Sequence, residues 1–269
     1  MRDPRAGEGG GLMDYRVTAV GFVIGIIAGI SGIGGSSLLA PLLILALGVK
    51  PSIAVGTDLV YSVPMKLLAA FAHVRQGTVD RAVITRLSIG GVPGTLAGLG
   101  AFYALRRWAG IAQLDRIERH AIGIVILAAA VSALVLFLFR RRLAAQVDAE
   151  AAARRAKWTV AIGAVVGFLV ALTSIGSGSI TLPLLMLALP MVGLRALIGS
   201  EIVFGAIIIP IAAIGHAGFA NVDWMLALSL AIGAVPGAYV GVRFCGFLGE
   251  GFLRPAVMIV LAYAGFKLL

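Results

Sequence analysis

Long apolar runs separated by short polar, glycine or proline breaks cover the chain from residue 17 to its end. A bilayer core about 30 Å thick takes roughly 20 apolar residues of helix, about twice the length of a barrel strand. Polar positions do not alternate within these runs, so the sequence predicts an all-α integral membrane protein with about eight to ten membrane segments. The segments are 17–35, 38–48, 52–73, 82–105, 119–139, 158–176, 178–190, 195–215, 223–245 and 252–269.

The two halves of this pattern are copies of one another. Residues 33–47 match residues 175–189 without a gap at an offset of 142, with nine identities in fifteen positions. Beyond one inserted residue the offset is 143, and it pairs His, Asp and Pro residues that a biased composition does not imitate. The chain is therefore predicted to hold two homologous helical repeats, an architecture typical of secondary transporters. The pairs are Gly56/Gly199, His73/His216, Val79/Val222, Asp80/Asp223, Gly90/Gly233, Pro93/Pro236, Gly94/Gly237 and Gly98/Gly241.

The duplication predicts four parts: a polar N-terminal segment 1–16, membrane repeat 17–139, a basic linker 140–157 and membrane repeat 158–269. Arginines and a lysine in the linker place it in the cytoplasm by the positive-inside rule. The repeats are parallel if 17–48 is one broken span and inverted if it is a hairpin. Counts of Lys and Arg do not separate these cases, and two short helices meeting at a Gly/Ser tip favour the hairpin and inverted repeats.

Composition and charge exclude other classes of protein. The 269 residues are 60% hydrophobic and only 13% charged, and their mean hydropathy is +1.05. Soluble domains carry roughly 25% charged residues, so a soluble enzyme is excluded and a multi-pass inner-membrane protein is indicated. The net charge of +10 comes from short loops, which suits a membrane surface and not a nucleic acid. Cys245 is the one cysteine, so no disulfide framework or cysteine metal site is expected, and no cofactor is implied.

Two Gly/Ser-rich stretches, residues 31–37 and 173–179, interrupt apolar segments at matching repeat positions. Unwound backbone at membrane depth must be buried or line a polar cavity, and each break exposes the N-terminus of a short helix, which favours an anion. The two breaks are expected to converge around one cavity near mid-membrane. The predicted substrate-binding residues are Ser31, Gly32, Gly34, Gly35, Ser36 and Ser37 in the first break, and Ser174, Gly176, Ser177, Gly178 and Ser179 in the second.

The alternative is that these glycines and serines are the small residues on which membrane helices pack. Their matching positions in the two repeats favour binding. A second set of glycines recurs every four residues on one helix face, and for it helix packing is the favoured interpretation. This set is Gly90, Gly94, Gly98, Gly233, Gly237 and Gly241.

Charged residues within apolar segments are expected to face the bundle interior. Asp58 and Glu201 occupy matching positions after Gly56-Thr57 and Gly199-Ser200. They are candidates for coupling transport to H⁺ or Na⁺, and the equally open alternative is that they brace the neighbouring break. Lys66 lies eight residues after Asp58, and pairing with a carboxylate is favoured over contact with the ligand.

Each of His73 and His216 ends an apolar segment and is followed seven residues later by an aspartate. Hydrogen bonding that fixes the loop is the favoured interpretation, and a proton relay is the alternative. His, Cys and Glu residues do not occur at the spacing of metal ligands, so no metal site is predicted.

The run Gly-Ile-Gly-Gly-Ser-Ser-Leu-Leu-Ala-Pro-Leu-Leu at 32–43, together with Gly56-Thr57, His73, Gly77-Thr78-Val79-Asp80 and Gly90-Gly91-Val92-Pro93-Gly94, resembles the sulfite exporter TauE/SafE family, also called the toluenesulfonate uptake permease family. The resemblance covers roughly residues 17–269. It implies a secondary transporter of small sulfur-containing or organic anions such as sulfite, sulfoacetate or other sulfonates, and the family name points to export.

Three function classes remain open at the level of sequence: a carrier for such an anion or another small carboxylate, an anion channel, and a membrane enzyme. The enzyme is disfavoured because no paired base and nucleophile or metal motif is evident, and no catalytic residue is predicted. The expected partners are a small anionic substrate, the lipid bilayer and H⁺ or Na⁺ as coupling ion. The sequence leaves the coupling ion, the direction of transport and homo-oligomer formation undetermined.

Overall fold

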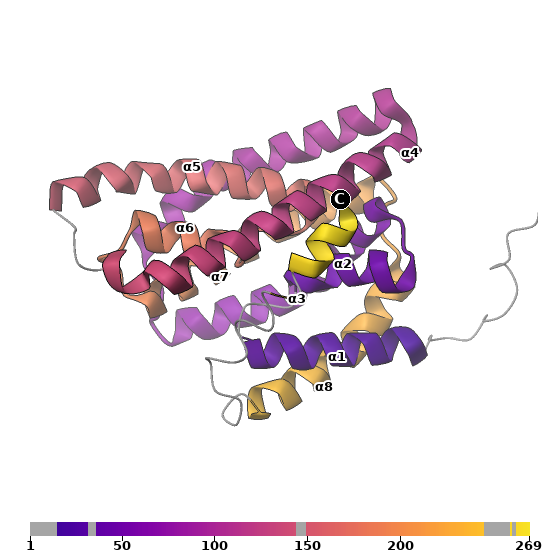
Figure 1. Cartoon of the computed structure of the whole chain (residues 1–269), viewed down its shortest axis with the longest axis horizontal. Coiled ribbons are helices and arrows are strands. Elements are labelled where there is room, and N and C mark those ends of the chain that lie inside the picture. The colour runs from indigo at the N-terminus through magenta and orange to yellow at the C-terminus, as the bar shows by residue number, and fades with distance from the viewer. Residues whose placement is uncertain (1–14, 32–35, 144–148, 245–258, 260–261) are drawn as a thin grey trace, which may run out of the picture.

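The computed structural model describes residues 15–31, 36–143, 149–244, 259 and 262–269. In this part of the chain the ordered elements are all helices, most of them aligned with the long axis of the molecule (Figure 1). They are α1 (Tyr15–Ser31), α2 (Ser36–Leu47), α3 (Pro51–Arg75), α4 (Arg81–Leu143), α5 (Ala149–Thr173), α6 (Thr181–Ala188), α7 (Leu194–Gly218) and α8 (Trp224–Phe244). Residues 262–268 add a short helical stretch at the C-terminus.

Four of the described helical stretches are long and apolar enough to cross a membrane. Two shorter apolar helices, Val17–Ile27 and Lys157–Thr173, stand at the start of the repeats. Large apolar side chains such as Leu68, Ile214 and Tyr239 are exposed on the outside of the bundle, as lipid contact requires. These features confirm the all-α integral membrane fold. The four stretches are Pro51–Arg75, Arg81–Ile111, Leu194–Gly218 and Trp224–Gly241.

The described helices extend into two polar stretches that the hydrophobic pattern leaves between apolar segments. The stretch 106–118 belongs to α4, which is interrupted only at Gly110, where φ is 76° and ψ is 167°. The chain turns back at this glycine, so α4 has two arms, 81–109 and 111–143 (Figure 1). Of the basic linker 140–157, α4 extends to Leu143 and α5 begins at Ala149. Ala, Arg, Glu and Lys are strong helix formers, so polar positions there extend the helices instead of ending them.

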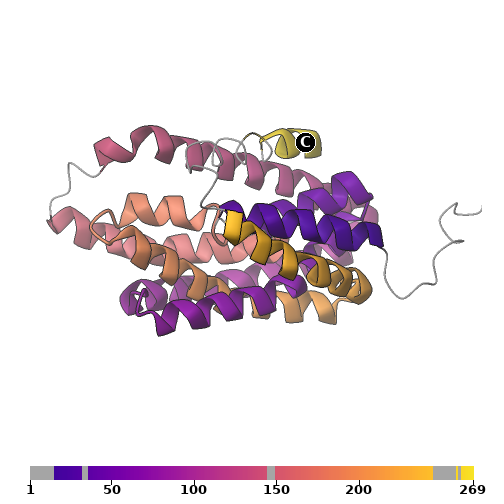
Figure 2. The ribbon, with the colours of Figure 1, turned by 90° about the horizontal axis from the view of Figure 1, so that it is seen from below.

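Close glycine contacts between helices come in pairs that follow the repeat register. Gly94 of α4 faces Ala164 of α5, and its counterpart Gly237 of α8 faces Phe22 of α1. An added Cβ would lie 2.1 Å and 2.2 Å from the backbone oxygens of these partners, so only glycine fits. This confirms that the four-residue glycine spacing serves helix packing. The first helix of each repeat therefore packs on the fourth helix of the other, and α1 lies beside α8 in both Figures 1 and 2.

Equivalent helices of the two repeats run antiparallel. Gly56, near the start of α3, faces the Asn221 carbonyl beyond the end of α7, while Gly199, near the start of α7, faces the Thr78 carbonyl beyond the end of α3. Residues Gly123 and Gly265, 142 positions apart, face each other near the C-terminus. Antiparallel pairing of equivalent helices is what inverted repeats require. Inversion across the bilayer stays a prediction.

Candidate functional site

Two equivalent hydrogen bonds join the start of each of the helices α3 and α7 to the turn that follows the other helix. The Asp223 backbone N–H donates to Thr57 Oγ1 at 3.1 Å, and the Asp80 N–H donates to Ser200 Oγ at 2.9 Å. The aspartate side chains cap the following helices, because Asp223 Oδ1 accepts from the Leu226 N–H and Asp80 Oδ1 accepts from the N–H groups of two residues in α4. Asp58 and Glu201 directly follow the two anchoring hydroxyls in the chain, so these contacts fix their position.

The second break, between α5 and α6, has an irregular backbone that glycine makes possible. The φ angles are 59° at Ser174, 128° at Gly176 and 113° at Gly178, all in the region that L side chains avoid. The chain is held by Thr181, whose hydroxyl and N–H both donate to the Gly176 carbonyl, at 2.8 Å and 3.1 Å. The break is therefore a defined turn that orients the start of α6.

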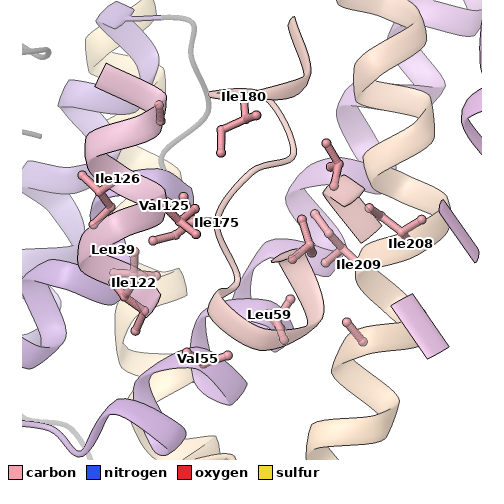
Figure 3. Close-up of a cluster of buried hydrophobic side chains, with 14 of the residues drawn as sticks. Leu39, Val55, Leu59, Ile122, Val125, Ile126, Ile175, Ile180, Ile208 and Ile209 are labelled. Atoms are coloured by element: carbon pink, nitrogen blue, oxygen red, sulfur yellow. The ribbon is translucent and has the colours of Figure 1, made fainter. Parts of the chain in front are cut away.

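This break lies inside the protein. Ile175 and Ile180 belong to the same buried cluster as residues of α2, α3, α4 and α7, which Figure 3 shows around the irregular segment. The expectation that unwound backbone is shielded from lipid is met for the second break, since Thr173, Ser174, Ser177 and Ser179 are all buried.

Two serines of the break have no polar partner in the described structure. The hydroxyl oxygens of Ser177 and Ser179 are buried and form no hydrogen bond with any described residue. Buried polar side chains are nearly always hydrogen-bonded, so an exception calls for an explanation such as a ligand. Both hydroxyls stand within four residues of the start of α6 at Thr181, where the helix dipole favours negative charge. The N–H groups of Thr181 and Leu182 are already bonded to the Gly176 and Gly178 carbonyls, so the serine hydroxyls are the donors left for a ligand.

Asp58 of α3 reaches the second break directly. It is fully buried, and the Ser174 hydroxyl donates to its Oδ2 at 2.6 Å. A second hydroxyl, that of Ser62 one turn later in α3, lies 3.4 Å from Oδ1. This carboxylate of the first repeat therefore braces the break of the second repeat.

Glu201 of α7 has a cationic partner. Its Oε1 lies 3.1 Å from Lys66 Nζ, and both side chains are almost completely buried. Of the two interpretations for Lys66, the structure shows pairing with a carboxylate. Asp58 and Glu201 occupy equivalent positions near the starts of two antiparallel helices. Glu201 therefore pairs not with a residue beside Asp58 but with Lys66, which lies two turns further along α3, about 12 Å along the axis.

The two histidines hold backbone segments. His216 of α7 is fully buried, and its Nε2 lies 2.8 Å from the Ala171 carbonyl of α5, just before the second break. His73 Nδ1 lies 2.8 Å from Thr78 Oγ1 in the turn that follows α3. Both contacts fix local backbone, in agreement with the favoured interpretation, and a relay role is a separate question.

The first break falls mostly beyond what the structure describes. Gly32, Gly34 and Gly35 lie outside the described residues, and for Ser31, Ser36 and Ser37 only the backbone at the helix ends is described. Convergence of the two breaks around one cavity therefore stays a prediction.

The hollows on the surface of the described structure include two of several hundred Å³. One of about 480 Å³ lies between α1 and α8 and is mainly apolar. The other, of about 420 Å³, lies beside the turn from α2 to α3 and is lined by Lys50, Asp115, Arg116 and Arg119 among others. Asp58, Lys66 and the second break line neither of them. Within the described residues, no three His, Cys, Asp or Glu side chains come together as a metal site would require.

Two residues at this site were missed in the sequence. Ser62 and Gly205 stand four positions after Asp58 and Glu201, at the same repeat offset of 143. Ser62 donates to Asp58, whereas an added Cβ on Gly205 would lie 3.3 Å from Lys66 Nζ, so this glycine leaves room for the lysine. The repeat register could have drawn attention to this pair, because the two residues occupy equivalent positions one helical turn after the two carboxylates.

Buried charged side chains, a shielded helix break and interlocked helices are features typical of membrane transporters with broken helices. The chain belongs to the sulfite exporter TauE/SafE family, whose model matches residues 17–268. It is a multi-pass inner-membrane protein.

Relatives in two bacteria carry transporter names. The chain is 33% identical over 258 residues to "Probable membrane transporter protein YjnA" of Bacillus subtilis (strain 168), covering 96% of this chain and 100% of the relative. It is 28% identical over 256 residues to YdhB of the same organism, named in the same way, covering 94% and 99%. A "Probable membrane transporter protein" of Xylella fastidiosa (strain 9a5c) is 29% identical over 119 residues, covering 44% and 43%. No solved structure was found to match the chain.

Proposed function

We propose that the protein is a secondary transporter that exports small sulfur-containing or organic anions, such as sulfite, sulfoacetate or other sulfonates. Family membership supports the transport of a small anion. The observation that carries the proposal is the pair of buried hydroxyls without partners, Ser177 and Ser179, at the N-terminal end of α6. Together with the backbone of Gly176 and Gly178, they form the described half of the proposed substrate site.

Neutral donors and a helix end suit the chemistry of a transported anion. A helix N-terminus contributes about 0.3–1 kcal/mol to binding a negative group at exposed sites and up to about 2 kcal/mol when partly buried. Each neutral hydroxyl adds about 0.5–1.5 kcal/mol. The nearby cation, Lys66, is already paired with Glu201. Binding of this kind is weak enough for the substrate to be released.

The first break would supply the second half of the site. Residues Ser31 to Ser37 match the second break at the repeat offset, and α2 begins at Ser36 as α6 begins at Thr181. Asp58 and Glu201 are the proposed coupling residues, with H⁺ or Na⁺ as the coupling ion. Because apolar side chains such as Ile175 and Ile180 close over the second break, the helices must part before a substrate enters.

The proposal is tested by transport into liposomes that contain the purified protein. The substrates are labelled sulfite, sulfoacetate, a second sulfonate and a small carboxylate such as acetate. We expect saturable uptake of at least one sulfur-containing anion and acceleration of that uptake by unlabelled anion on the opposite side. Current that is linear in voltage and does not saturate would instead identify a channel, and transport of acetate alone would identify a carboxylate carrier.

A further inference from the structure

The two equivalent carboxylates are surrounded by different chemistry. Asp58 contacts only hydroxyls, those of Ser174 and Ser62, and no described cation forms an ion pair with it. Glu201 contacts the ammonium of Lys66. The repeats therefore agree in the position of the carboxylate and differ in the charge of its partner.

The difference is built into the sequence at two further positions. Where the first repeat has Ser62, the second has Gly205, whose missing side chain admits Lys66. Where the first repeat has Lys66, the second has Ile209, which is buried and apolar. As a result, among the described residues a cation contacts Glu201 and none contacts Asp58.

These surroundings predict opposite charge states. A buried carboxylate facing a cation stays ionised, because separating the pair would leave two uncompensated charges. A buried carboxylate without a cation is neutralised by a proton at lower cost than it is kept charged. The contact between Ser174 and Asp58 also survives protonation, since a hydroxyl donates to a carboxylate and accepts from a carboxylic acid.

We propose that Asp58 is the proton-binding residue of the transport cycle, whereas Glu201 stays ionised in its pair with Lys66. The inference rests on the proposed function and assigns H⁺ as the coupling ion. Protonation of Asp58 removes a negative charge beside the second break, where Ser174 leads directly to Ser177 and Ser179. The anion then binds without like-charge repulsion, so proton and anion cross together, and export occurs when the outward anion gradient exceeds the inward proton gradient. The proton binds a carboxylate oxygen of Asp58 on one side and leaves it on the other.

Other titratable groups surround Asp58 and are part of the test. On α3 itself Tyr61 is the nearest, and from α7 His216 approaches the start of α3 at Gly56. The described part of the second break and helix α2 contribute no titratable side chain. Further charged groups on the packed elements include Lys66 on α3, Glu201 on α7, Asp223 just before α8, and Asp115 on α4, which accepts from Ser52 at the start of α3.

The first experiment is infrared difference spectroscopy of the purified protein between alkaline and acidic buffer. We expect a protonated-carboxyl band in the wild type that Asp58→Asn loses and that the double variant Glu201→Gln/Lys66→Met retains. Glu118, a second buried carboxyl group without a described partner, contributes its own band, and Glu118→Gln identifies it. His216→Gln tests whether this histidine changes the carboxyl band. A spectrum of Asp58→Asn that matches the wild type would overturn the proposal, as would loss of the same band in the double variant.

Ser174→Ala keeps the test informative if Asp58→Asn does not fold. Loss of the 2.6 Å contact should shift the frequency of the Asp58 band without removing it. An unshifted band would assign the signal to another carboxyl group and contradict the proposal.

The second experiment measures sulfoacetate uptake in liposomes, because the charge of this anion changes little near neutral pH. The apparent affinity of the wild type should fall at least severalfold as pH rises, and that of Asp58→Asn should not change with pH. A wild-type response to Na⁺ in place of pH would overturn the choice of proton. If the wild type transports none of the sulfur-containing anions, the proposed substrate class fails, while the infrared result still decides whether Asp58 binds a proton.

Discussion

At the scale of residues, the site depends on hydroxyl groups whose partners differ. The Ser174 hydroxyl is committed to Asp58, whereas those of Ser177 and Ser179 are buried without a described partner. A buried hydroxyl without a partner costs folding free energy, about 1–3 kcal/mol, unless a ligand satisfies it. The last two serines are therefore better explained by substrate than by the fold.

This gives the first prediction. Ser177→Ala and Ser179→Ala should each weaken the apparent affinity for the transported anion roughly two- to tenfold, because each removes one neutral hydrogen bond. The melting temperature of the purified protein should stay the same or rise. Affinity is measured from the concentration dependence of uptake. Ser88→Ala in α4 is the control, because it also removes a buried hydroxyl without a described partner but lies outside the break. Unchanged affinity in both variants would return the break to a packing role.

The serines are a cleaner test than the glycines. At Gly176 and Gly178 the φ angles of 128° and 113° already exclude a β-branched residue, whatever binds there. Loss of transport in Gly178→Val would therefore not separate a ligand site from a strained backbone.

The sequence located Asp58, Glu201 and Lys66 inside the bundle, because a charge within an apolar run has few other places to go. The partner of Lys66 was not predictable, since the sequence places Lys66 two turns from Asp58 along one helix and does not give its distance to Glu201 on another. The choice depends on the crossing of α3 and α7 and on the space above Gly205, which only the packed structure specifies.

At the scale of elements, glycine contacts hold α4 against α5 and α8 against α1. Gly94 and Gly237 occupy equivalent positions, and each has a backbone oxygen about 2 Å from where its Cβ would be. Gly100, also in α4, has no atom within 4 Å of its Cβ position and serves as a matched control.

We predict that Gly94→Val and Gly237→Val destabilise the protein to a similar extent, by about 1–3 kcal/mol or more, because the helices must separate. Gly100→Val should leave the melting temperature nearly unchanged. Thermal unfolding in detergent compares the three. A stable Gly94→Val protein, or equal effects of Gly94→Val and Gly100→Val, would contradict the close approach of the helices.

Most elements followed from the hydrophobic pattern, and the exceptions have a physical cause. The hydrophobic pattern leaves the polar stretch at 106–118 between apolar segments, but its residues form helix on both sides of Gly110. A polar residue is compatible with helix wherever its side chain reaches water or the membrane surface, so polarity marks the end of a span and not the end of a helix. The turn itself needs the positive φ of Gly110.

At the scale of the whole molecule, the repeats exchange helices instead of folding side by side. The first helix of each packs on the fourth of the other, and α3 and α7 cross antiparallel at the centre. The sequence indicated two copies but not which helices pack together. A helix face lined with glycine could pack on a helix of its own repeat as well as on one of the other repeat.

The antiparallel crossing predicts the topology. Gln76 follows α3 and lies near the start of α7, whereas Gly218, the last residue of α7, lies near the start of α3. These nearly equivalent positions should open on opposite membrane faces, with Gln76 on the cytoplasmic side. Single cysteines, Gln76→Cys and Gly218→Cys in a Cys245→Ser background, can be labelled in intact spheroplasts with an impermeant maleimide. Only Gly218→Cys should react before permeabilisation. The same behaviour of both cysteines would indicate parallel repeats, and with Gln76 in the cytoplasm neither would then react.

The central claim is that an anion crosses the membrane through a site formed by the second helix break. The most direct measurement is counterflow of labelled sulfite or sulfoacetate in liposomes containing either the wild type or Ser177→Ala/Ser179→Ala, with Gly100→Val as the matched folded control. At low substrate concentration we expect the label to accumulate transiently in liposomes with the wild type and with Gly100→Val. The double variant should accumulate much less label, although it melts at the same or a higher temperature. Equal counterflow by the wild type and the double variant, or none with any sulfur-containing anion, would contradict it.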